Sequence, residues 1–237
     1  MTKNITTPKI ALCVFAHPDD VDFSSAGTLA KWAGKGSEIT CLVCTDGGKG
    51  SEDPKMTSAK LAKIRMKEQR DAGKALGVRD VIFLGHRDGE LTVDFKLKED
   101  ISKVIRQVRP DVVITTDPLF LYSTKRGFVN HSDHRAAGQA AIDAVFPLAR
   151  DRLNFPHHEK EGIGTHKVKT LLLVAFEDAE HYEDITTTMT QKITALQQHR
   201  SQVRGGDFEK RVRERSKSLG KKPGFAYAEG FKKVELA

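Results

Sequence analysis

The feature that most constrains this fold is a series of short apolar segments that recurs along the chain. They lie at 9–16, 38–44, 80–84, 111–115 and 168–176. Successive positions in each segment are apolar instead of alternating with polar ones, a pattern typical of strands covered on both faces. We therefore expect these segments to be strands of one buried sheet.

Helical patterns lie between these strands. They cover 25–34, 58–76, a stretch with apolar residues from Ile101 to Val108 that ends before Pro110, 133–149 and 185–200. Within 58–76 we expect one buried stripe, made of Leu61, Ile64, Glu68, Ala72 and Ala75. Alternating strands and helices predict an α/β fold with a mostly parallel, doubly wound sheet and helices on both faces. We find no linker or repeat, so we expect a single domain over 1–237 that includes the basic segment 204–237.

Composition excludes several classes of protein. No stretch of the 237 residues approaches the roughly 20 apolar residues of a membrane helix. The polar N-terminus does not resemble a signal peptide, so we expect a cytoplasmic protein without a membrane partner. The three cysteines cannot form a disulfide framework. Cys41 and Cys44 should lie on opposite faces of a strand as buried thiols.

Positive charge gathers near the C-terminus. The net charge is +7, and residues 204–237 hold ten Lys and Arg against five Asp and Glu, an excess of +5. No nucleic-acid motif accompanies this charge, so we expect no nucleic-acid partner. The basic segment is interpreted as a solvated surface, with a helix at 210–222, or as an attraction for an anionic substrate.

Carboxylates and histidines follow the predicted strands. Ligands of open α/β sheets bind outside the carboxyl ends of the strands, so these segments mark the predicted site. They read Ala-His-Pro-Asp-Asp at 16–20, Thr-Asp-Gly-Gly at 45–48, Gly-His-Arg-Asp-Gly-Glu at 85–90 and Thr-Asp-Pro at 116–118. The first lacks the Gly-x-Gly-x-x-Gly pattern of dinucleotide sites, and the second does not fit a phosphate-binding P-loop.

Two clusters together predict a metal site. One is His-x-x-Asp, from His17 to Asp20, and the other is His-x-x-His, from His131 to His134. Imidazole and carboxylate ligands suit zinc, and a catalytic zinc keeps three protein ligands and one open position. The same donors also suit iron, cobalt or manganese. Asp19 either takes a proton from water at the metal or caps the next helix.

Other polar residues have plainer interpretations. Ser132 is a candidate N-cap, and Asp133 suits the first turn of a helix. His86 is expected to support the site or to be exposed, and His157 and His158 to be a solvated pair in a loop. Asp117 either orients a metal-binding histidine or forms a turn with Pro118.

The motifs also resemble a known family. Ala-His-Pro-Asp-Asp, Arg-Asp-Gly-Glu-Leu at 87–91 and His-Ser-Asp-His-Arg at 131–135 resemble the LmbE-like, or PIG-L, de-N-acetylases in order and spacing. Further similar segments are Thr-Asp-Gly at 45–47, Arg-x-x-Glu at 65–68 and Tyr-Ala-Glu-Gly-Phe at 227–231. The resemblance implies a Rossmann-like fold and zinc-dependent removal of an N-acetyl group, typically from a glucosamine unit. It also implies a trimer or hexamer.

The resemblance assigns roles to particular residues. His17, Asp20 and His134 would bind zinc, and Asp19 would be the general base for a metal-bound water. His131 would stabilise the oxyanion and help to protonate the leaving amine. Arg65 and Asp88 match positions that contact the sugar. Val21 and Val129 depart from residues common in the family, a glutamate and a tyrosine respectively, and the second departure leaves the substrate open.

Two alternatives to this function remain. One is a metal-dependent hydrolase of another ester or amide bond, such as a phosphoester. The other is a non-catalytic module that binds carbohydrate or nucleic acid.

Overall fold

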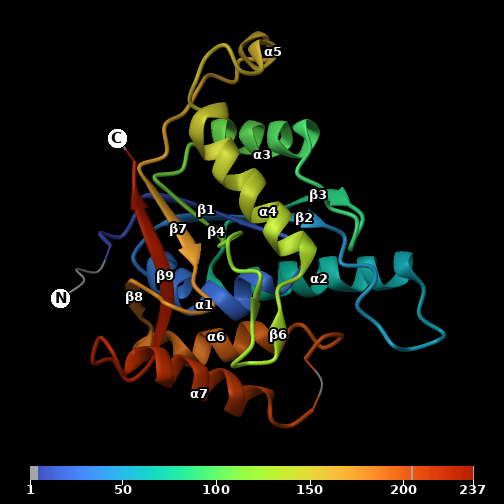
Figure 1. Ribbon diagram of the computed structural model, residues 1–237, viewed down its shortest axis with the longest axis vertical. Coiled ribbons are helices and arrows are strands. Elements are labelled where there is room, and N and C mark those ends of the chain that lie inside the picture. Colours follow the sequence, from blue (N-terminus) through green and yellow to red (C-terminus); the bar gives the residue numbers. More distant parts are fainter. Residues whose placement is uncertain (1–4, 204, 237) are drawn as a thin grey trace.

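The computed structural model describes residues 5–203 and 205–236, and a seven-stranded sheet forms its centre (Figure 1). The strand order is β3-β2-β1-β4-β7-β9-β8, and neighbours are parallel except where β9 pairs with β7 and β8. The strands are β1 Ile10–Phe15, β2 Glu38–Thr45, β3 Asp80–His86, β4 Val112–Thr116, β7 Thr170–Val174, β8 His181–Asp184 and β9 Ala228–Glu235. A separate antiparallel pair is made of β5 Tyr122–Ser123 and β6 Phe128–Val129. The predicted mostly parallel α/β sheet is confirmed.

Helices cover both faces of this sheet. They are α1 Asp20–Ala33, α2 Ser58–Leu76, α3 Phe95–Val108, α4 Ser132–Asp143, α5 Pro156–Lys160, α6 Met189–Leu196 and α7 Phe208–Gly220. A π-helical segment, Ala144–Leu148, follows α4, and a 3-10 turn, Thr186–Thr188, precedes α6. α3 and α4 lie on one face, and α1, α2, α6 and α7 lie on the other (Figure 1). None of the helices in the described ranges is long and apolar enough to cross a membrane.

Burial on two faces explains the continuous apolar run of β1. Leu12 and Val14 pack in the core beneath α3 and α4, whereas Cys13 and Phe15 pack in the core beneath α1. Alternate residues of a strand point to opposite faces, so a strand between two helix layers needs apolar residues at every position. Cys41 and Cys44 likewise contribute to opposite cores as free, buried thiols, as predicted.

Several helix boundaries differ from the prediction. α1 begins at Asp20, five residues before the predicted range 25–34. Its first turn contains Asp22, a fully buried carboxylate that accepts hydrogen bonds from Gln69 and His199. The predicted helix 185–200 is shorter, because a 3-10 turn occupies Thr186–Thr188 and α6 ends at Leu196.

The buried stripe of α2 was also predicted imperfectly. Leu61 and Ala72 are buried as expected, but Ile64, Glu68 and Ala75 are only half-buried. The buried face instead includes Arg65, Gln69 and Leu76. Two polar side chains can occupy this face because they form hydrogen bonds with the loop after β1, which the hydrophobic pattern does not show.

Two strands near the C-terminus were missed. β8 and β9 carry charged residues and so lack the apolar pattern of a buried strand. In β9, the buried Glu229 pairs with Lys192 of α6, and Lys232 pairs with Asp117 at the end of β4. β9 lies between β7 and β8, so residues 228–235 of the basic segment 204–237 are built into the same sheet. The predicted helix at 210–222 is confirmed as α7.

The sheet reverses its winding direction between β1 and β4. From β1 the chain proceeds to β2 and β3 on one side, then crosses to β4 on the other side. The loops that leave β1 and β4 therefore diverge, and such a switch point is where open α/β sheets bind ligands. α4 packs closely against β4, because a Cβ added to Gly138 would lie 2.3 Å from the carbonyl oxygen of Thr116.

This close approach yields a stability prediction. Gly138→Ala should lower the free energy of unfolding by about 1–3 kcal/mol, since the backbone of β4 cannot move without disturbing the sheet. Gly164→Ala is the matched control, because its Cβ would meet nothing within 4 Å. Denaturant unfolding measures both changes, and equal stability of the two variants would contradict the packing described.

Candidate metal centre

Segments distant in sequence meet at the carboxyl edge of the sheet. His17 and Asp20 follow β1, Asp88 follows β3, and His131 and His134 lie at the start of α4. The left-handed backbone of Asp19, with φ 104° and ψ −28°, turns the chain sharply from β1 into α1. The fold thus brings both predicted metal-binding clusters to one locus.

His17, Asp20 and His134 form a group that could hold a metal ion. Their ligand atoms all lie within 4.8 Å of one another. Nδ1 of His17 lies 3.5 Å from Oδ2 of Asp20, and Nε2 of His134 lies 3.1 Å from Oδ1 of Asp20. Two imidazoles and one carboxylate suit a divalent metal such as zinc.

Neighbouring groups orient both imidazole rings. Nε2 of His17 lies 3.2 Å from a carboxylate oxygen of Asp133 and 3.2 Å from one of Asp88. Carboxylates accept hydrogen bonds, so they keep a proton on Nε2, and a metal would replace the proton on Nδ1, which lies on the side of Asp20. In the same way, Nδ1 of His134 lies 3.0 Å from Oδ1 of Asn130, which leaves Nε2 available to a metal.

Charge at this locus favours a cation. Burial opposes protonation of His17, but the surrounding carboxylates outweigh it and raise the pKa of His17 to about 12. Burial likewise opposes ionisation of Asp20, but His134 and His17 hold the pKa of this carboxyl well below its usual range. Burial opposes ionisation of Asp88, but the hydrogen bonds from His17 and the Lys49 amide, with the charges of His17 and Arg65, together lower its pKa to about 2.

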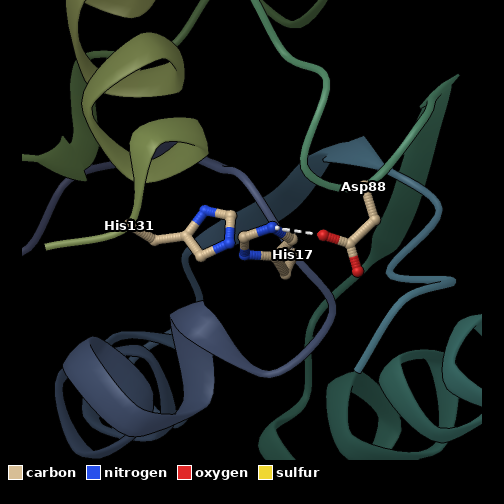
Figure 2. Close-up of side chains that lie close together, drawn as sticks. All are labelled: His17, Asp88 and His131. Atoms are coloured by element: carbon tan, nitrogen blue, oxygen red, sulfur yellow. Dashed lines mark ion pairs between the residues drawn. The ribbon is translucent and has the colours of Figure 1, made fainter. Parts of the chain in front are cut away.

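A second group shares His17. Figure 2 shows His131 and Asp88 on opposite sides of the His17 ring, and ligand atoms of these three residues also lie within 4.8 Å. This group would use Nε2 of His17, so it would remove the N–H from which the fully buried Asp133 accepts a hydrogen bond. The group at Nδ1 keeps that hydrogen bond, so it is the better metal site.

A third group lies between α3 and α5. Glu99 pairs with Nε2 of His157 at 2.6 Å and lies 3.6 Å from Nε2 of His158. Nδ1 of His158 faces the Arg106 guanidinium at 3.3 Å, and a guanidinium only donates. The proton of His158 therefore lies on Nε2, which makes this group a hydrogen-bonded cluster. The prediction of a solvated pair is wrong for His158, which is 1% exposed.

Asp19 lies beside the metal-binding group and is held in a strained conformation. A non-glycine residue at such a φ costs on the order of 1–3 kcal/mol. Its amide donates to Oε1 of Gln69 at 2.7 Å, and Arg65 contacts its Oδ1 at 3.2 Å. Burial is the largest cause that raises the pKa of Asp19 to about 6, against the opposing charge of Arg65. Asp19 occupies the N-cap position, but its side chain makes no capping hydrogen bond.

Arg65 is buried beneath this loop. It donates to the carbonyl oxygens of Pro18 at 2.6 Å and Gly47 at 2.9 Å, in addition to contacting Asp19. These bonds hold the loop that carries the site. Asp88 is also buried, and it accepts from the amide of Lys49. The expected sugar contacts of Arg65 and Asp88 remain predictions.

His131, and not the predicted Ser132, is the N-cap of α4. Its Nδ1 accepts from the amide of Asp133 at 3.1 Å, so in the neutral ring the proton lies on Nε2. Burial is the largest cause that lowers the pKa of His131, followed by the nearby positive charge of His17. A neutral imidazole with an exposed N–H is a hydrogen-bond donor beside the metal-binding group.

Two further predictions concerned strand ends. His86 is partly exposed and lies 3.8 Å from Asp100, so it belongs to neither of the groups that contain His17. Asp117 accepts from the amide of Leu119 and pairs with Lys232. Of its two interpretations, the structure supports the turn.

Comparisons with known proteins identify the family of this chain. The family described as PIG-L, GlcNAc-PI de-N-acetylase, matches residues 12–145, more than half of the chain. The chain belongs to the PIG-L family. The predicted family and the predicted deacetylase class are thereby confirmed.

Three relatives of this PIG-L protein show the extent of the similarity. Diacetylchitobiose deacetylase of Thermococcus kodakarensis is 29% identical over 233 residues, covering 95% of this chain and 83% of that protein. A probable N-acetyl-alpha-D-glucosaminyl L-malate deacetylase 2 of Bacillus cereus is 30% identical and covers 81% and 83% respectively. The solved N,N'-diacetylchitobiose deacetylase of Pyrococcus horikoshii, complexed with its inhibitor MPG, has a TM-score of 0.89 at 30% identity, over 96% of this chain and 84% of that one.

The sequence interpretation of this PIG-L protein missed three supporting residues. Asp133 was assigned only to a helix terminus, whereas it contacts His17. Asn130 orients His134, and Gln69 holds the Asp19 amide. The position of Asp133 between two candidate ligands was the one available signal. Asn130 and Gln69 carry no sequence signal, because their partners depend on the tertiary fold.

The support from Asp133 can be tested in this PIG-L protein. Asp133→Asn should weaken zinc binding by about 10–100-fold, since it removes the charged acceptor that orients His17. Asp117→Asn is the matched control, because Asp117 is also a buried carboxylate but lies after β4 and contacts no metal-binding residue. Competition with a chromogenic chelator measures both affinities. Equal affinities would show that Asp133 does not support the site.

Proposed function

We propose that this protein is a zinc-dependent hydrolase that removes the acetyl group from an N-acetylglucosamine-type sugar or sugar conjugate. The observation that carries the proposal is the convergence of Nδ1 of His17, the Asp20 carboxylate and Nε2 of His134 beside the carboxylate of Asp19. Relatives that act on acetylated glucosamine compounds, at about 30% identity, support the substrate class.

The three-residue donor set fits zinc at a catalytic site. It leaves an open position, and each imidazole has a fixed lone pair because its other nitrogen is engaged by Asp133, Asp88 or Asn130. Zinc held there would polarise the amide carbonyl and acidify water.

In this proposal Asp19 accepts the proton of the attacking water. Arg65 engages its Oδ1, and no hydrogen bond from the described ranges engages its Oδ2. Arg65 holds this carboxylate and Gln69 holds the Asp19 backbone amide, so both keep Asp19 oriented while the proton moves. Asp19 then returns the proton to the nitrogen of the leaving amine, which separates from acetate.

His131 is placed to stabilise the oxygen that gains negative charge. Its Nδ1 accepts from the Asp133 amide, so the proton of the neutral ring lies on Nε2, which can donate. Its ring centroid lies 4.7 Å from that of His17, so the donor lies next to the metal-binding group. A donor aimed at a developing oxyanion stabilises the transition state, and the same N–H can assist protonation of the amine.

The proposed reaction is tested by product analysis. Zinc-reconstituted protein should release acetate and free amine from N-acetylglucosamine or diacetylchitobiose, and chelation should abolish the release until zinc is restored. A zinc-bound protein that cleaves no acetylated amine in a broad panel, but cleaves phosphoesters, would establish the alternative hydrolase. One that only binds sugar would establish a binding module.

The role of Asp19 gives a sharper prediction. Asp19→Asn should lower kcat by about 10²–10⁴-fold, because the amide cannot accept a proton from water. The substitution keeps the shape of the side chain, so zinc content should stay at one ion per chain. Full hydrolysis by the variant would remove Asp19 from the mechanism.

A further inference from the structure

A cavity of about 340 Å³ opens beside Asp20 and His134. It extends between α1, α7 and the ends of β4, β7 and β9, and most of its lining is apolar. Phe23, Phe128 and Phe176 contribute aromatic rings. Because the cavity begins at the metal-binding group, a substrate whose amide reaches that group extends into it.

Most of the charged groups lining this cavity are already paired. Asp20 and His134 belong to the metal-binding group. Lys192 and Glu229 pair at 2.6 Å with both side chains buried, and Glu229 also accepts from amides of α1. Two arginines, Arg126 and Arg215, complete the set of charged residues in the lining.

The two arginines have no acidic partner among residues 5–203 and 205–236. Arg126 donates to the carbonyl oxygen of Phe176 at 3.0 Å, and its guanidinium lies 5.9 Å from the Phe128 ring. Arg215 has no hydrogen bond or ion pair with the described residues. Both arginines are exposed residues that line the cavity. Desolvation of the Arg215 guanidinium, and then the charge of Arg126, lower the pKa of Arg215.

Two like charges that line one cavity repel each other, whereas an anion bound between them is attracted to both. A guanidinium also presents planar donors that match a carboxylate or phosphate. The geometry points to an anion subsite in which Arg126 and Arg215 bind a carboxylate or phosphate group of the substrate. The inference rests on the proposed function, because it places the acetamide of the same molecule at the metal centre.

This subsite gives part of the basic C-terminal segment a role. The sequence left two interpretations of that segment, a solvated surface and an attraction for an anionic substrate. Arg213 illustrates the first, since it pairs with Glu209 on the same helix. Arg215, two residues later, illustrates the second.

The test compares charged and neutral ligands on the zinc-reconstituted protein. Calorimetry measures the affinity of glucosamine, of glucosamine phosphorylated at the anomeric or the primary hydroxyl, and of muramic acid, which adds a carboxylate. The ratio kcat/KM is measured for the N-acetyl form of each. At least one anionic ligand should bind about tenfold or more tightly than glucosamine, and the phosphate and carboxylate arms identify which anion fits.

Arginine variants assign the preference to the subsite. The double variant Arg126→Gln/Arg215→Gln should lose the anion preference while keeping the affinity for neutral glucosamine, which also shows that it is folded. Arg213→Gln is the matched control, because it removes the same charge from the same helix outside the cavity lining and should keep the preference.

The outcomes separate this inference from the proposed function. If no anionic ligand binds more tightly than glucosamine, or if the double variant keeps the preference for anions, the inferred anion subsite is contradicted. Release of acetate would still support the proposed function in that case. If the arginine-dependent preference is present but no acetylated amine is hydrolysed, the subsite stands and the proposed reaction is wrong.

Discussion

The buried carboxylate of Asp133 joins the segments that form the candidate metal centre. One oxygen lies 3.2 Å from Nε2 of His17 and accepts from the amide of Gly89, and the other accepts from the amide of Leu91. The loop after β1, the loop after β3 and the start of α4 are thereby held together. Because Asp133 is fully buried, breaking these bonds would leave an uncompensated charge, so the arrangement of the centre depends on them.

A strained backbone next to this anchor completes the arrangement. The left-handed conformation of Asp19 lets two consecutive carboxylates point in different directions. Asp20 contacts His134, and Asp19 contacts Arg65. α2 stabilises this conformation through Gln69 and Arg65, which lie four residues apart on its buried face. Strain that the surrounding structure supports in this way is common where chemistry occurs.

The sequence predicted the elements whose burial shows in their own residues, such as strands buried on both faces and helices with one apolar stripe. β1 was recognised because both its faces pack against helices, and α3 because its apolar residues keep helical spacing. β9 was not recognised, since its charged residues Glu229 and Lys232 are paired with partners remote in the chain. Its position in the sheet depends on those tertiary contacts, which no local pattern contains.

The same distinction applies to the site. Strand ends and spacing nominated the clusters from His17 to Asp20 and from His131 to His134, and the resemblance to the family selected His17, Asp20 and His134 among them. The function of Asp133 could not be predicted, because its partners are 42 to 116 residues away. The anion subsite likewise combines a loop after β5 with α7, and only the fold shows that Arg126 and Arg215 line one cavity.

The most direct test of this account is the position of the metal itself. Anomalous diffraction at the zinc edge from zinc-loaded crystals should show one ion bound by Nδ1 of His17, the Asp20 carboxylate and Nε2 of His134, at distances of about 2.0–2.2 Å. An ion bound instead by Nε2 of His17 with Asp88 and His131, or no ion in crystals saturated with zinc, would contradict it.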